Sequence, residues 1–287
     1  MSPTPVRNVS DTARWVAAYR ARESARPDAI FHDHLADRLA GERGHAIANL
    51  ATMHSQWALI TRTRLIDDLV LQSVAQGTNC VLNLAAGFDT RPYRLALPSD
   101  LLWIEGDLAP LIEEKEELLR NETPRCRLER QSVDLADPGV RAAFLHEANR
   151  RASRTLVITE GLIIYLETAA VVELAQAFAA ESNYKHWIVD FSSPDIVGMM
   201  RKSMGTALVH SPFQFVATGG VTLFEQQGWE AEHILSLMKE ARRLRRLPTW
   251  MRPFALLPQD NPRRTKGRWS VVVQFKQRKG TVQTEQS

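Results

Sequence analysis

Three acidic residues, Asp107, Asp134 and Glu160, each follow a short apolar stretch with the pattern of a β-strand. Because the carboxyl ends of neighbouring parallel strands meet at one edge of a sheet, we expect these carboxylates to line one crevice. Asp107 stands twenty residues after Gly87, where a carboxylate can accept both hydroxyls of a ribose, and Glu105 is the alternative for this role. Such a crevice suits a ligand that carries a ribose and positive charge.

The stretch 80–95, CVLNLAAGFDTRPYRL, predicts the strand, tight turn and helix that this crevice needs. Pro92 suits the first turn of the helix. A dinucleotide would require three glycines and a helix N-terminus free of negative charge, but here Gly87 is the one glycine and Asp89 follows it. A ligand with positive charge and no phosphate fits better, and S-adenosylmethionine is the predicted cofactor. The alternative is an ordinary strand and turn without a ligand.

Strands and helices alternate along most of the chain, which predicts an α/β protein with right-handed crossovers and a mainly parallel sheet. A late hairpin is expected to pair antiparallel at the sheet edge. Beyond the first strand, further strands are predicted over 101–105, 126–133, 155–159, 186–191, 229–234 and 268–275, and helices over 11–23, 45–76, 110–122, 139–150, 167–182 and 222–228.

The two N-terminal helices precede the sheet, so residues 1–78 are predicted to form a helical cap on a domain of residues 79–287. The alternation lapses over 192–220, where Met and Phe residues lie beside glycines. This stretch is interpreted either as an apolar cap over a substrate pocket or as a surface helix and loop.

The composition is that of a globular protein, because 287 residues with 44% hydrophobic side chains can bury a large core. No stretch resembles a signal peptide or reaches the roughly 18 apolar residues of a membrane span, so a cytoplasmic location without membrane is expected. Cys80 and Cys126 are interpreted as structural thiols, and no ligand pattern predicts a metal.

Positive charge is concentrated near the C-terminus. Residues 239–280 carry thirteen Lys and Arg against two acidic residues, which gives this tail +11 and leaves −8 for the remainder. A basic tail can meet nucleic acid, but this one lacks interleaved aromatic side chains. A solvated face is therefore favoured over nucleic-acid binding.

Six stretches together carry a family resemblance over about residues 20–175: ARESARPDAIFHD, TRTRLIDD, VLNLAAGFDTRPYRL, WIEGDLAP, SVDLAD and TEGLIIYL. The sequence resembles the leucine carboxyl methyltransferase family, especially its bacterial branch of S-adenosylmethionine-dependent methyltransferases. The C-terminal third matches only loosely. The resemblance implies a class I methyltransferase fold, a Rossmann-like sheet of seven mostly parallel strands with strand 7 antiparallel.

By position, the resemblance implies cofactor contacts for eight residues. They are the basic residues near the methionine carboxylate (Arg22, Arg62), the glycine turn (Ala85, Gly87), the ribose acid (Asp107), the adenine contacts (Asp134, Leu135) and a residue near the methionine moiety (Glu160). Arg64 is an alternative to Arg62. The family usually has glycine where this chain has Ala85, and the added methyl is expected to disturb cofactor binding unless φ is negative there.

The reaction expected from these features is transfer of a methyl group from sulfonium to oxygen. A carboxylate acceptor, with an ordinary pKa of roughly 4, is already ionised at neutral pH and needs no general base. The predicted function is therefore O-methylation of a carboxylate on a small metabolite, with no catalytic residue and no oligomeric state assigned. The alternatives are a phenol or polyketide hydroxyl, with His210 as the base, a protein C-terminal carboxylate, or a degenerate cofactor-binding or interaction protein.

Overall fold

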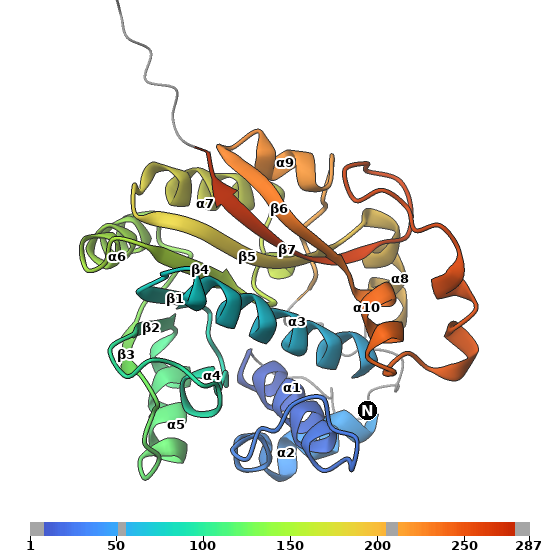
Figure 1. The fold of residues 1–287 in the computed structure, drawn as a ribbon, viewed down its shortest axis with the longest axis horizontal. Helices are drawn as coiled ribbons and strands as arrows, with labels where there is room; N and C mark the ends of the chain where they lie inside the picture. Colours follow the sequence, from blue (N-terminus) through green and yellow to red (C-terminus); the bar gives the residue numbers. More distant parts are fainter. Residues whose placement is uncertain (1–8, 51–55, 205–211, 279–287) are drawn as a thin grey trace, which may run out of the picture.

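The computed structural model describes residues 9–50, 56–204 and 212–278, and its seven strands form one sheet in the order β3-β2-β1-β4-β5-β7-β6 (Figure 1). The first five strands are parallel, and β7 pairs antiparallel with both β5 and β6. The fold class predicted from the sequence is thereby confirmed. The strands are β1 (Cys80–Leu84), β2 (Leu102–Asp107), β3 (Arg127–Ser132), β4 (Thr155–Thr159), β5 (Tyr184–Ser192), β6 (Trp229–Ser236) and β7 (Ser270–Gln277).

Helices cover both faces of the sheet because side chains alternate between the faces along each strand. On one face, Leu82 and Leu84 of β1 pack with α6 (Pro138–Arg150), α7 (Thr168–Ala180) and α9 (Val221–Glu225). On the other face, Val81 packs with α3 (Gln56–Ala75) and α10 (Leu237–Arg243). In Figure 1, α3 crosses in front of the strands.

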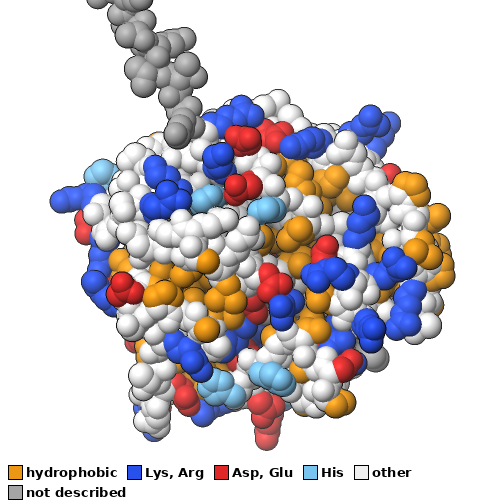
Figure 2. Space-filling view, in the orientation of Figure 1, with side chains coloured by type: hydrophobic (Ala, Val, Ile, Leu, Met, Phe, Trp, Pro, Cys, Tyr) orange, Lys and Arg blue, Asp and Glu red, His pale blue; other side chains and the backbone are white. Residues whose placement is uncertain are grey.

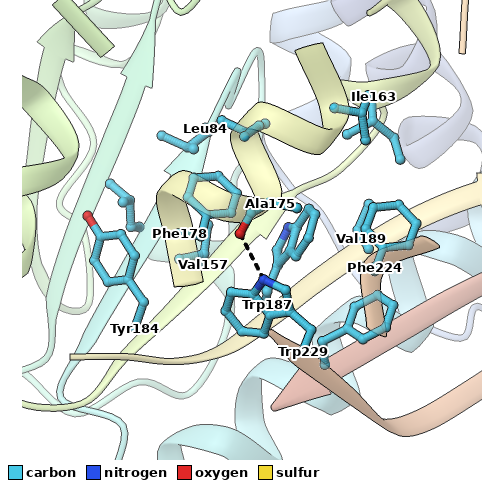
Figure 3. Close-up of a cluster of buried hydrophobic side chains, with 14 of the residues drawn as sticks. Leu84, Val157, Ile163, Ala175, Phe178, Tyr184, Trp187, Val189, Phe224 and Trp229 are labelled. Atoms are coloured by element: carbon cyan, nitrogen blue, oxygen red, sulfur yellow. Dashed lines mark hydrogen bonds between the residues drawn. The ribbon is translucent and has the colours of Figure 1, made fainter. Parts of the chain in front are cut away.

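Trp187 of β5 lies at the centre of the first face, among the rings of Phe178, Phe224 and Trp229 (Figure 3). The ring centroids lie 5.2, 5.3 and 5.5 Å from that of Trp187, in edge-to-face arrangements that aromatic quadrupoles favour. The Trp229 Nε1–H donates to the Ala175 carbonyl at 3.0 Å. This cluster therefore fixes α7 and α9 on this face of the sheet, before the carboxyl ends of the strands.

The three N-terminal helices differ in what they pack against. α1 (Val9–Ser24) and α2 (Ala36–Leu50) pack on each other, α1 also contacts α3 and α2 contacts α5 (Ala109–Leu119), whereas α3 lies on the sheet face. The sequence predicted one helix over 45–76, but the structure has α2 and α3 as separate helices, and residues 51–55 lie outside the described part. Both helices have the same apolar periodicity, so the sequence does not reveal that their apolar faces pack against different parts of the protein. The predicted domain division at residue 78 stays a prediction.

The remaining elements lie around the strand ends and the C-terminal edge. They are α4 (Arg91–Arg94), α5 (Ala109–Leu119), α8 (Pro194–Met204) and the 3₁₀ turns η1 (Ile163–Tyr165), η2 (Thr249–Met251) and η3 (Phe254–Leu256). In the described part of the chain, no helix combines the length and apolar character that crossing a membrane requires.

Candidate functional site

A cavity of about 1150 Å³ opens at the carboxyl ends of β1 to β5, between the sheet and α1, α3 and α8. Ligand pockets commonly measure roughly 300–1,000 Å³, so there is room for a cofactor and a second molecule. Most of the predicted cofactor residues line this cavity: Arg62, Ala85, Gly87, Asp107, Asp134, Leu135 and Glu160. The structure does not place Arg22 among the lining residues.

The turn after β1 has two residues in the left-handed region of backbone space. The φ angles are +51° at Ala85 and +48° at Gly87. Glycine adopts this conformation freely, whereas for alanine it costs about 1–2 kcal/mol. The condition under which Ala85 would be harmless, a negative φ, is therefore not met. Its backbone N–H is satisfied by the Gly106 carbonyl at 2.7 Å, which ties the turn to β2.

Asp107, at the end of β2, links the same turn to the cavity wall. One carboxylate oxygen accepts the Gly87 N–H at 2.7 Å and the other accepts the Leu108 N–H at 2.8 Å. Burial raises the pKa of Asp107 above its ordinary value, although these two N–H groups act in the opposite direction. The residue lines the cavity with acceptor lone pairs to spare, because a carboxylate can accept about four hydrogen bonds.

Glu105, the alternative ribose acid, is held elsewhere. Its side chain is fully buried, bonds Lys115 Nζ at 2.8 and 2.9 Å and accepts from Arg130 Nε at 2.8 Å. It does not line the cavity. Of the two candidates, the geometry favours Asp107 for contact with a ligand.

Asp134 and Leu135 follow β3 at the next strand end. The Asp134 side chain is exposed and accepts the Ala136 N–H at 2.9 Å, and the Leu135 carbonyl accepts from Arg141 at 2.9 Å. These bonds hold the loop after β3 against the cavity, where the carboxylate of Asp134 stands among apolar side chains such as Leu135.

Glu160, after β4, is paired with two arginines. It accepts from Arg62 Nε at 2.9 Å, and its other oxygen lies 2.8 Å from Arg91 Nη1. Burial alone would raise the pKa of Glu160, but the guanidinium groups of Arg91 and Arg62 outweigh burial and lower it. Arg62 also bonds Asp190 at 2.9 Å. The crevice expected to be simply acidic is therefore an alternating set of carboxylates and guanidiniums.

A buried ion network extends from this pair toward the N-terminal helices, and sequence reasoning missed it. Its members contact one another within hydrogen-bonding or ion-pair distance: Arg20, Asp33, Asp67, Asp89, Arg91, Arg94 and Asp190, with Glu160 and Arg62. Buried charges are retained where they are paired, so the network makes the strand-end region polar yet internally satisfied.

Arg20 and Arg22 lie on different sides of α1. Arg22 donates to the Ala48 carbonyl and to Asn49 of α2, outside the cavity lining. Arg20 lines the cavity, and donates to Asp33 at 2.8 Å and to the Phe88 carbonyl at 2.6 Å. Arg20 stands four residues after Val16, which also lines the cavity, and this helical spacing is the signal that could have indicated it. Arg64 is also outside the lining, paired with half-buried Asp68.

The outer part of the cavity is mostly apolar. Two buried indole nitrogens of lining residues have no hydrogen-bond partner, namely Trp15 Nε1 and Trp57 Nε1. The predicted 192–220 cap contributes Ile196, Met199, Met200, Pro212, Phe213 and Gln214 to the lining.

Among the described residues, the lining contains no histidine, cysteine or lysine. His210 lies outside the described residues. Within the described ranges, no cluster of three or more potential metal ligands is present.

Comparisons with known proteins point to one family. A model of the leucine carboxyl methyltransferase family matches residues 13–179. A Streptomyces avermitilis protein named "Putative S-adenosyl-L-methionine-dependent methyltransferase" is 35% identical over 185 residues, which is 60% of this chain and 64% of the relative. A Mycolicibacterium smegmatis protein of the same name is 34% identical over 193 residues, 61% of this chain and 64% of the relative. The matches thus span less than two thirds of these relatives.

Two solved structures share the fold. A "putative methyltransferase" from Thermobifida fusca covers 93% of this chain and 94% of its own, with a TM-score of 0.60 and 13% identity. A DUF574 family protein from Streptomyces avermitilis covers 92% and 97%, with a TM-score of 0.53 and 13% identity. At this identity the likeness concerns the fold alone.

Proposed function

Because the chain belongs to the leucine carboxyl methyltransferase family, we propose that it is an S-adenosylmethionine-dependent O-methyltransferase that acts on the carboxylate of a small molecule. The choice of acceptor depends mainly on one observation. No histidine, the side chain that most often acts as a general base, lines the described part of the cavity, and the carboxylate of Glu160 pairs with Arg62 and Arg91. An acceptor that is already ionised needs no general base.

The residues present fit the cofactor. Asp107 has acceptor capacity for ribose hydroxyls, Asp134 and Leu135 supply a polar and an apolar contact for a base, and Glu160 with Arg62 offers both signs of charge to the amino acid end. S-adenosylmethionine would supply a methyl group on a positively charged sulfur. The polar strand ends would bind it, while the apolar residues opposite would exclude water from the reacting atoms.

The unpartnered donors suit a carboxylate acceptor. Trp15 Nε1 and Trp57 Nε1 are buried without partners on side chains that line the cavity, and each can donate to an acceptor oxygen. A buried donor without a hydrogen bond costs about 1–3 kcal/mol, so a substrate that accepts hydrogen bonds from these groups is favoured over one that cannot. Catalysis would then come from holding the oxygen in line with the methyl group.

The test is methyl transfer from labelled S-adenosylmethionine to a panel of carboxylic acids and phenols. A carboxyl methyl ester releases methanol in mild base, whereas an aryl methyl ether does not. Base-labile product and a rate that is flat around neutral pH are expected. If the product is stable to base and the rate of methyl transfer rises with pH, the acceptor is a phenol or polyketide hydroxyl and not a carboxylate.

Trp15→Phe tests the donors separately. This variant removes the indole N–H and is expected to raise KM for the acceptor without changing affinity for the cofactor. Trp103→Phe is the matched control, because Trp103 Nε1 is also buried and unpartnered but does not line the cavity. Equal effects of the two variants on KM would contradict the assignment.

A second candidate, a cofactor-binding protein without catalysis, is favoured by the positive φ of Ala85. Calorimetric titration with S-adenosylmethionine and S-adenosylhomocysteine distinguishes it. Binding without transfer to any acceptor of the panel would support this candidate. The cytoplasmic location stays a prediction from the sequence.

A further inference from the structure

An exposed apolar loop follows α10. Five large apolar side chains in the described residues are more than half exposed, and four of them lie within eight residues: Trp250, Phe254, Leu256 and Leu257. Scattered single residues of this kind are normal on protein surfaces, but a local cluster indicates a contact surface. We refer to residues 250–257 as the 250–257 loop.

The 250–257 loop is anchored by a buried residue of its own. Ala255 is buried within it and packs with Leu247 and with Ala241 of α10. Its outward apolar side chains are therefore presented by an anchored backbone. Met251 of the same loop lines the large cavity, as does Gln259 just beyond it, so the loop stands beside the proposed site.

The surroundings of this loop are strongly basic. Arg242, Arg245, Arg252, Arg264 and Lys266 are exposed and have no carboxylate partner among the described residues, whereas Arg243 and Arg263 pair with Glu240 and Glu225. Figure 2 shows orange and blue side chains interspersed on the right-hand side, over the part of the molecule that carries α10 and the chain after it. Apolar side chains and surplus positive charge therefore occur on one surface.

We infer that the 250–257 loop docks on an anionic lipid surface, with the mouth of the cavity beside it. Tryptophan and phenylalanine are favoured at the lipid–water interface, and nearby arginines are attracted to anionic headgroups. A lipid surface accepts adjacent aliphatic side chains such as Leu256 and Leu257, which a nucleic acid would leave in water. This contact needs no spanning helix, and it stands whether or not the proposed methyl transfer is correct.

The experiment is co-sedimentation of the full chain with two kinds of vesicle, phosphatidylcholine alone and phosphatidylcholine mixed in equal amounts with phosphatidylglycerol. Binding is expected only to the mixed vesicles and is expected to weaken as salt is added. Equal binding to both vesicles, or binding to neither, would overturn the inference.

Two matched pairs of variants locate the contact. The triple variant Phe254→Ser, Leu256→Ser and Leu257→Ser is expected to weaken binding at least tenfold, and Val140→Ser, an exposed apolar residue of α6, is expected to leave it unchanged. Arg252→Gln is expected to weaken binding about fivefold, whereas Arg150→Gln on α6 is not. Circular dichroism verifies that each variant is folded. If the triple variant or Arg252→Gln is folded but binds vesicles as the wild type does, the replaced residues do not take part in the contact.

Light scattering and retention on RNA address the other occupants of this surface. A dimer that the triple variant dissociates would identify a second copy of the chain, and RNA binding that Arg252→Gln abolishes would identify nucleic acid. Either result, together with no vesicle binding, would refute docking on lipid.

Discussion

The carboxylate of Asp107 accepts the backbone N–H of Gly87 at 2.7 Å and so joins the end of β2 to the turn after β1. One residue thereby does two things in the proposed site. It fixes the backbone of the turn, and it faces the cavity with the oxygen atoms that a ribose would contact. Because both functions depend on the same carboxylate, replacing it is expected to affect cofactor binding strongly.

We predict that Asp107→Ala weakens binding of S-adenosylmethionine. Each hydrogen bond from a ribose hydroxyl to a charged acceptor contributes about 1.5–3 kcal/mol, so loss of even one lowers affinity about tenfold or more. Asp107→Asn keeps one acceptor oxygen but no charge, so its affinity for S-adenosylmethionine is expected to lie between those of the wild type and Asp107→Ala. Calorimetric titration measures all three.

Glu105→Gln is the control for this prediction. Its replacement leaves Lys115 and Arg130 without their buried partner and is expected to lower the free energy of unfolding by about 3–5 kcal/mol. Because Glu105 does not line the cavity, the affinity of the folded fraction should stay as in the wild type. A larger loss of affinity in Glu105→Gln than in Asp107→Ala would reassign the ribose contact.

The strand-end carboxylates could be predicted from the sequence because short apolar runs mark the buried strands, and the rules of parallel sheets place the ends of these strands at one edge. Asp107, Asp134 and Glu160 line the cavity for that reason. Their partners could not be predicted. Arg62 meets Asp190 across 128 residues of chain, and such a pairing depends on how α3 packs on the sheet.

Two finer details were also beyond the sequence. Arg20 and Arg22 are two positions apart on a helix, so their side chains point to nearly opposite sides of it. Which of the two faces the cavity depends on how the helix is rotated about its axis, and the sequence does not give that rotation. The positive φ at Ala85 could not be predicted from the residue type, because alanine ordinarily avoids the left-handed region that it adopts here.

Ala85→Gly is predicted to stabilise the protein. Relief of left-handed strain gains about 1–2 kcal/mol, and the added backbone freedom of glycine in the unfolded chain takes back about 0.5–1 kcal/mol. The free energy of unfolding in urea should therefore rise by about 0.5–1 kcal/mol. Removal of a methyl group from the cavity wall should also increase affinity for the cofactor in calorimetry.

Ala86→Gly is the matched control, because the neighbouring Ala86 does not have a positive φ. There the same chemical change brings only the entropic cost of glycine, so a decrease in stability of about 0.5–1 kcal/mol is expected. Stabilisation of both variants, or of neither, would show that backbone strain at Ala85 is not the cause.

Arg62→Ala is predicted to destabilise the protein by about 3 kcal/mol, since it leaves the mostly buried carboxylates of Glu160 and Asp190 without this partner. Arg64→Ala removes a side chain two residues away that is more than a third exposed, pairs with the half-buried Asp68 and donates to the Ile30 carbonyl at 2.7 Å. Its loss should cost about 1 kcal/mol, well below the loss expected for Arg62→Ala. Urea unfolding measures both, and similar losses would mean that the buried pair is not the source of the effect.

Stability is predicted to fall as the solution is acidified. Burial acts to raise the pKa of Asp33, but Arg20 and Arg94 outweigh it and lower the pKa, and arginines similarly lower the pKa of Asp89 and Glu160. A carboxylate with a lowered pKa in the folded protein contributes stability above its unfolded value, roughly 4, and that stability is lost as pH falls through the lower folded value. Asp107, whose pKa is raised, acts in the opposite direction but is a single group.

Urea unfolding between about pH 7 and about pH 3 tests this linkage. The free energy of unfolding should decline slightly below about pH 6.5, because burial lowers the pKa of His186 and this side chain takes up a proton on unfolding. It should decline more steeply below about pH 5, with a slope that reports the protons taken up on unfolding. Asp33→Asn removes one of the three carboxylates, so a reduced slope is expected, even though the variant is less stable at every pH. A slope in Asp33→Asn equal to that of the wild type would exclude this carboxylate from the acid response.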